Sequence, residues 1–319
     1  EKATFAPLRD RQFRRAIAEN AIFSQPISEG GQNWTSKPNQ TQCRKVDGGW
    51  KINGFKKFAS LAGYCDYYTI VCTEVFEGQE PRHEDTMLFV VHKDTPGLTV
   101  KGEWDPLGMR GTNSRDLILK DVFVAADDLL MPRGIFNKTL PNWPHMMITL
   151  SPTYMGVAQG AYDFMVDYLK GKIPGQPPID RRMYATKRIA VGKMYARLAN
   201  IRALWWQAFG ESKGFPSKAE VLRMYAAQYN VMEGAAEMTS MAIRTCGGQS
   251  MLKSLPLERM YRDSRCGALM LPFTSEIMED YLGVLALYEM DELDHAPGDE
   301  GGARNSLWRG DSSAARAVR

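Results

Sequence analysis

The stretch 247–282 gathers the residues of this chain whose types and spacing best suit ligand chemistry. Gly247 and Gly248 end one helical pattern, Pro256 begins a second, and Thr274 precedes a third. Helix ends carry unpaired backbone groups, and an N-terminal end carries a positive dipole, so the stretch predicts a site for a phosphate-bearing ligand. A capped helical hairpin without a ligand explains the same signals and stays open as an alternative.

Composition excludes several classes of protein. Forty basic and 37 acidic residues give a net charge of +3 over 319 residues, which is too balanced for a nucleic-acid-binding surface. The five cysteines form no CxxC pair and the four histidines show no ligand spacing, so we expect no bound metal and a reducing compartment. No apolar run approaches the roughly 20 residues of a membrane span, and the N-terminus lacks a signal-peptide core. We therefore expect a cytoplasmic protein without a membrane span.

Two kinds of periodicity divide the chain into elements that must position such a site. From residue 45 to about 127 the period is two, with β-branched and aromatic residues, which predicts four to seven strands of a mostly antiparallel sheet or barrel. Residues 47–49 and 53–54 are hairpin signals, and 94–97 marks a further turn.

The second half of the chain has the period of a helix. Helices are expected over about 153–170, 181–211 and 217–245, with a final one from Thr274. Short connections between them predict an antiparallel four-helix bundle. Residues 1–20 are charged and fit one further helix.

Several short segments, in this order, resemble acyl-CoA dehydrogenases, and the resemblance spans about residues 20–290. They are FSQP at 23–26, KKFASLAG at 56–63, LGMRGTNS at 107–114, the paired glycines, LPLERMYRDSR at 255–265 and TSEI at 274–277. The resemblance implies an α+β fold, an antiparallel β-barrel or sheet domain followed by an antiparallel four-helix bundle. Its implied divisions are a remnant of an N-terminal helical region (1–20), a middle β domain (21–131), a helical bundle (132–293) and a disordered tail (294–319).

The resemblance also implies FAD as the cofactor. Phe58 would stack near the isoalloxazine and the Ser60 hydroxyl would meet its N5 edge. Arg244, beside the paired glycines, would reach a pyrophosphate across a subunit boundary. The full set of implied cofactor residues is Ser24, Gln25, Phe58, Ala59, Ser60, Arg244, Gly247, Gly248, Thr274 and Glu276.

The implied reaction is α,β-dehydrogenation of an acyl-CoA or related thioester, which needs a carboxylate to remove an α-proton. The family's usual position for this base, two residues before the Thr of TSEI, is Pro272 here. The other position used in the family falls near Met146. Neither Pro nor Met accepts a proton, so His145 is the candidate catalytic base.

Two other functions remain open. A flavin-dependent monooxygenase on the same fold needs no α-proton base and tolerates Pro272. The chain is alternatively a subunit that lacks its own base within a heteromeric acyl-CoA dehydrogenase. The expected partners are an acyl-CoA-like small molecule, further copies or a second subunit in an oligomer, and an electron-accepting flavoprotein.

Overall fold

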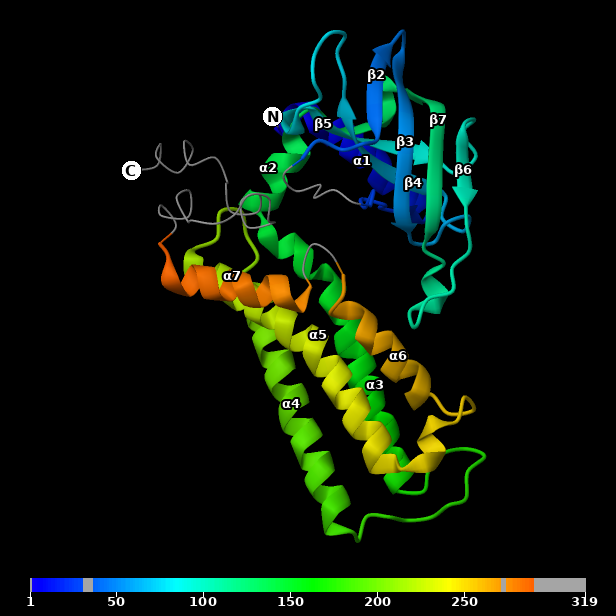
Figure 1. The fold of residues 1–319 in the computed structure, drawn as a ribbon, viewed down its shortest axis with the longest axis vertical. Coiled ribbons are helices and arrows are strands. Elements are labelled where there is room, and N and C mark those ends of the chain that lie inside the picture. Colours follow the sequence, from blue (N-terminus) through cyan, green and yellow to red (C-terminus); the bar gives the residue numbers. More distant parts are fainter. Residues whose placement is uncertain (1, 31–36, 271–273, 290–319) are drawn as a thin grey trace. The chain divides into compact units, whose positions relative to one another are not determined.

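A computed structural model describes residues 2–30, 37–270 and 274–289, and it divides the chain into two compact units (Figure 1). The first, the β unit, contains residues up to Asp105 together with Arg110–Pro141. The second, the helical unit, contains Pro106–Met109 and the described residues from Asn142 onward. Each unit is described by itself below.

The β unit holds one sheet of eight strands among the described residues, in the order β6-β7-β3-β2-β4-β5-β8, with β1 beside β4. Strand β4 pairs in parallel with β1 and β2, and every other pair is antiparallel. The strands are β1 (Phe23–Ser24), β2 (Gln42–Val46), β3 (Gly49–Ala59), β4 (Tyr67–Glu74), β5 (Thr86–His92), β6 (Leu98–Lys101), β7 (Arg115–Ala125) and β8 (Leu129–Met131).

The sheet curls over its own core, because strands that are not neighbours meet through their side chains. The ring of Trp50 on β3 lies 5.2 Å from the ring of Phe89 on β5. Nearly every residue of β4 and β5 is buried, which is why these segments are continuous apolar runs in the sequence. The sheet therefore encloses one core, and its strand ends are left to carry loops.

One of the two hairpin signals is confirmed and the other is wrong. Residues 47–48 join β2 to β3, with Val46 paired to Gly49. Residues 53–54, in contrast, lie inside β3, where the pairing with β7 shifts between Ile52 and Gly54. Gly54 is required because a Cβ at this position would lie 2.5 Å from the Cα of Thr41. The dipeptide therefore makes a bulge and not a turn, because a neighbouring segment crosses close to the strand.

The helical unit contains α3 (Ser151–Leu169), α4 (Ala185–Gly210), α5 (Lys218–Cys246), α6 (Leu257–Gly267) and α7 (Ser275–Leu287). The first three agree with the expected helices. The helix expected from Thr274 is present as α7, and the helical pattern that begins at Pro256 is present as α6. The sequence did not assign α6 to the bundle, but α6 packs against α3 and α5, whereas α7 lies across α5 (Figure 1).

The division between the two units also differs from the expected one at residue 131. Helix α2 (Ile135–Asn142) follows β8, and residues 132–141 belong to the β unit. Arg133 donates to the Glu74 carboxylate on β4 at 2.7 Å, and Phe136 is buried. These contacts hold the segment to the sheet.

The remaining elements are helix α1 (Lys2–Ala18) and five short 3-10 helices. The Arg15 guanidinium of α1 donates to the Asp128 carboxylate at 2.8 Å within the β unit. None of the helices in the described part of the chain has the length and apolar character needed to cross a bilayer. The tail expected at 294–319, and Pro272, lie outside the described residues. The 3-10 helices are His83–Asp85, Arg110–Thr112, Ala126–Asp128, Pro144–Leu150 and Gly248–Met251.

Candidate active site

The end of β3 turns an apolar surface outward. Phe58 and Leu61 have φ values of 53° and 62°, in the left-handed region that non-glycine residues rarely adopt. Such a conformation costs about 1–3 kcal/mol per residue and concentrates at functional sites. Here Phe58 is 60% exposed and Tyr64 is 72% exposed, while Ala59 between them is buried. We call Phe58, Leu61 and Tyr64 the apolar ledge.

Hydroxyl groups line the same strand end. The Ser24 hydroxyl donates to the backbone carbonyl of Ser60 at 2.5 Å. The Ser60 hydroxyl lies 2.8 Å from that of Ser114, which in turn lies 2.7 Å from that of Thr112. Gln25, the next residue after Ser24, is exposed. Segments far apart in sequence thus bring four hydroxyls to one edge of the ledge.

These residues fit a flavin ring. An isoalloxazine needs an apolar surface for its flat face and hydrogen-bonding groups for its polar edge. The ledge provides the first, with Phe58 supported from the side by the Trp104 ring at 6.1 Å and 75°. The exposed Ser60 provides the second. The structure thus brings Ser24, Phe58, Ala59 and Ser60 together.

The start of α7 is already capped by the chain itself. The Thr274 hydroxyl accepts from the Ile277 N–H at 3.5 Å, and Ser275 donates to the Glu233 carboxylate of α5. Glu276 is exposed, and its own backbone N–H together with the Thr274 hydroxyl holds the pKa of its carboxyl below the usual range. A carboxylate at a helix N-terminus competes with a phosphate for the same dipole.

Arg244, Gly247 and Gly248 lie at the other end of α5. Arg244 is exposed in the last turn, and Gly247 ends the helix with a φ of 87°. Residue 244 is 11 residues beyond Glu233 on α5, about 16 Å along the helix axis. Within one chain, therefore, Arg244 and the paired glycines do not meet Thr274 and Glu276.

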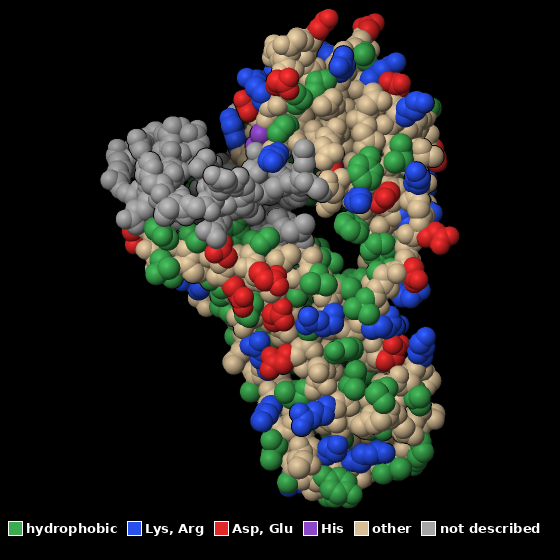
Figure 2. Space-filling view, viewed as in Figure 1, with side chains coloured by type: hydrophobic (Ala, Val, Ile, Leu, Met, Phe, Trp, Pro, Cys, Tyr) green, Lys and Arg blue, Asp and Glu red, His purple; other side chains and the backbone are tan. Residues whose placement is uncertain are grey.

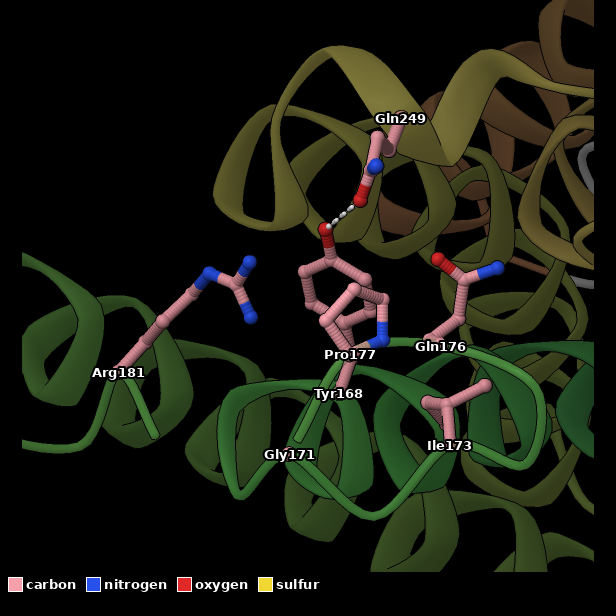
Figure 3. A pocket seen from close by; sticks show the side chains of 7 residues that line it. All are labelled: Tyr168, Gly171, Ile173, Gln176, Pro177, Arg181 and Gln249. Atoms are coloured by element: carbon pink, nitrogen blue, oxygen red, sulfur yellow. Dashed lines mark hydrogen bonds between the residues drawn. The ribbon is translucent and has the colours of Figure 1, made fainter. Parts of the chain in front are cut away.

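A small pocket lies close to this end of α5, and sequence reasoning missed its polar residues (Figure 3). The Tyr168 hydroxyl donates to the side-chain amide oxygen (Oε1) of Gln249 at 3.1 Å, and the Arg181 guanidinium lies 4.7 Å from the centre of the Tyr168 ring. Figure 2 shows several Lys and Arg side chains over this end of the helical unit. Lys187 is one cation here, and it donates to the Thr245 carbonyl. In the sequence, the position of Gln249 directly after the paired glycines is the feature that could have pointed to this pocket.

His145 lies in the 3-10 helix Pro144–Leu150 and is only 2% exposed. Within the described residues neither of its ring nitrogens has a hydrogen-bond partner. Burial lowers the pKa of its imidazole, although the carboxylates of Glu220 and Glu211 oppose that shift. His145 is thus a buried, neutral imidazole in this structure. The side chain of Met146 lies outside the described residues.

A curled sheet followed by an antiparallel helical unit makes the chain an α+β protein. Residues 27–122 match the model of the acyl-CoA dehydrogenase middle domain, and residues 148–270 match that of the acyl-CoA dehydrogenase C-terminal domain. The chain belongs to the acyl-CoA dehydrogenase family.

Two curated relatives and one solved structure illustrate the range of this family. The chain is 31% identical over 272 residues to the putative acyl-CoA dehydrogenase YdbM of Bacillus subtilis, covering 79% of this chain and 65% of that protein. It is 32% identical over 259 residues to L-evernosamine nitrososynthase of a Micromonospora species, covering 75% and 58%. KijD3 in complex with FMN and an amino keto sugar nucleotide is 26% identical, with a TM-score of 0.71 over 88% of this chain and 68% of that one. The chain thus spans about 60% of the length of the two curated relatives.

Proposed function

We propose that the protein is a flavin-dependent monooxygenase that oxidises the nitrogen of a small amine. The observation that carries the proposal is the chemistry at the two base positions: Pro272 has no ionisable group, and His145 is buried without a partner among the described residues. Abstraction of an α-proton requires a base within hydrogen-bond reach of that proton. A neutral amine already has a lone pair and requires no such base.

The relatives support the same proposal. A nitroso group carries oxygen on nitrogen, so a nitrososynthase such as the Micromonospora relative adds oxygen to an amine. KijD3 binds both FMN and an amino keto sugar nucleotide. We therefore infer an amine, of the amino sugar type, as the substrate class.

Residues of the β unit would hold the ring of the cofactor. Phe58 would stack on it, and Ser24 would fix the Ser60 backbone so that the Ser60 hydroxyl faces the polar edge. A bound flavin, once reduced, supplies the activation of molecular oxygen. The apolar ledge would keep water from that side of the ring.

Residues of the helical unit of a second copy of the chain would hold the phosphates of the cofactor. Arg181 is a fork-shaped cation, and Tyr168 and Gln249 add polar groups beside it (Figure 3). Exposed Arg244 adds a second guanidinium at the same end of α5. We propose FAD, because FMN has no pyrophosphate for this second group of residues.

Dehydrogenation of an acyl thioester is the second candidate, favoured by the similarity to YdbM. One experiment separates the two. The flavin-loaded protein is mixed without oxygen with saturated acyl-CoAs, and flavin absorbance is followed. We expect no bleaching, and we expect an amine product that carries oxygen on its nitrogen when the protein with reduced flavin meets oxygen and an amino sugar nucleotide. Rapid bleaching by an acyl-CoA would contradict the monooxygenase and favour the dehydrogenase.

A further inference from the structure

We propose that the hydroxyls of Ser60, Ser114 and Thr112 form a proton relay that serves the flavin site. The inference rests on the proposed flavin site. The chain of hydroxyls runs from Ser60 to Ser114 over 2.8 Å and from Ser114 to Thr112 over 2.7 Å. Both separations are ordinary hydrogen bonds between hydroxyl groups.

The chemistry of these three groups suits proton transfer in either direction. Each hydroxyl is both a donor and an acceptor, so in both bonds either oxygen can supply the hydrogen. A carboxylate or amide in the middle would fix the direction. A row of hydroxyls instead passes one proton by reversing all of its bonds together.

The burial of the three residues gives the relay an inlet and an outlet. Ser114, in the middle, is 6% exposed, Thr112 is half-buried and Ser60 is exposed on the apolar ledge. A ring stacked on the ledge covers Ser60 and separates it from bulk water. Protons then reach Ser60 through Ser114 and Thr112.

The backbone keeps the chain of hydroxyls in place. The Leu61 N–H donates to the Thr112 carbonyl at 2.7 Å, and the Asn113 side-chain amide donates to the Ala62 carbonyl at 2.7 Å. Ser24 donates to the Ser60 carbonyl and so fixes the other end. The segments 60–62 and 112–114 are therefore tied together by hydrogen bonds that do not use the Ser60, Ser114 or Thr112 hydroxyls, and loss of one of these hydroxyls leaves the segments joined.

The proton balance of one transfer is simple. Ser60 would give its proton to the oxygen that is reduced at the flavin, and would take one from Ser114, which takes one from Thr112, which takes one from solvent. Every hydroxyl ends neutral. Reoxidation of a singly protonated reduced flavin passes two electrons and the proton of the flavin to molecular oxygen, and one further proton from solvent completes hydrogen peroxide. The relay would supply that further proton, so the rate of reoxidation reports on it.

The test compares Ser114→Ala, Thr112→Val and the conservative Thr112→Ser with the unmodified protein. Thr86→Val is a matched control, because Thr86, on β5, is a buried residue whose hydroxyl donates to the His83 carbonyl. For each variant, flavin affinity is measured by titration, and the rate of reoxidation by oxygen is measured in H₂O and in D₂O. In addition, the unfolding midpoint is measured for the flavin-free Ser60→Ala, Ser114→Ala and double variants.

We expect Ser114→Ala and Thr112→Val to keep flavin affinity within about twofold and to slow reoxidation on the order of 100-fold, the lower end of general acid–base effects. The solvent isotope effect should change with them, Thr112→Ser should restore the rate, and Thr86→Val should leave it unchanged. In the flavin-free protein, the Ser60 and Ser114 changes should shift the unfolding midpoint non-additively.

The two proposals fail in different ways. Normal flavin binding with unchanged reoxidation in Ser114→Ala overturns the relay alone, as does an additive pair of unfolding shifts. Absence of flavin binding by the unmodified protein overturns the proposed function, and the relay with it. A large loss of flavin affinity in Ser114→Ala shows a purely structural role and also overturns the relay.

Discussion

The ammonium group of Lys56 lies 2.5 Å from the carboxylate of Glu29, and both side chains are buried in the β unit. Lys56 precedes the apolar ledge on β3, and the Glu29 carboxylate also accepts from the backbone N–H groups of Gln40 and Thr41. The pair therefore joins residues 29 and 40–41 to the strand that presents Phe58 and Ser60. Burial lowers the pKa of Lys56, and the Glu29 charge opposes this shift.

Removal of one partner of this pair should destabilise the β unit. We expect Lys56→Met to lower the free energy of unfolding by about 3–5 kcal/mol, because Glu29 is left as an uncompensated buried charge. Urea denaturation followed by tryptophan fluorescence measures it. The exposed Lys51→Met on the same strand is the control, and the double variant with Glu29→Leu should recover much of the loss. Equal unfolding midpoints for Lys56→Met and Lys51→Met would contradict the prediction.

His145 should make stability fall in mildly acidic solution. Its folded-state pKa is lowered by burial below the ordinary value of 6.5, so the unfolded chain binds more protons than the folded one below that pH. The neutral His145 contributes its full stabilisation above pH 6.5, and this contribution is lost as the pH falls from 6.5 through the folded-state pKa. The midpoint of urea denaturation, measured between pH 5 and 8, tests this. His145→Phe should flatten the profile.

Arg181 and Arg244 should matter for FAD more than for FMN. Loss of a hydrogen bond to a charged group costs about 1.5–3 kcal/mol, so each change to Ala should weaken FAD on the order of 10-fold or more and leave FMN nearly unchanged. Flavin fluorescence titration measures both affinities. Arg182→Ala is the control, because Arg182 pairs with Asp180 and is exposed. FAD affinity unchanged in both variants would show that the phosphates bind elsewhere.

The protein should form oligomers through α4. Trp206 and Phe209 are 56% and 51% exposed and form one aromatic cluster with Trp205, in which Phe209 stacks on Trp205 and Trp206 meets it edge-on. Apolar area of this kind on one face is typical of an interface between copies. Light scattering at micromolar concentration should give a dimer or larger assembly, and Trp206→Glu with Phe209→Glu should shift it toward the monomer. A monomeric unmodified protein with intact helices by circular dichroism would count against the interface.

The sequence by itself indicated most of the segments that form strands and helices, and it located the turn at residues 47–48. It also placed Phe58 and Ser60 in one candidate site. Local signals suffice for these, because periodicity, turn residues and short motifs act over a few neighbouring positions. Only the tertiary structure decided that residues 53–54 form a bulge under Thr41, that α6 completes the bundle, and that Ser114 and Thr112 extend the chain from Ser60. Tyr168, Arg181 and Gln249 likewise meet at one pocket. Such meetings depend on strand pairing and helix packing across long stretches of chain, and no local pattern records which distant residues will come into contact.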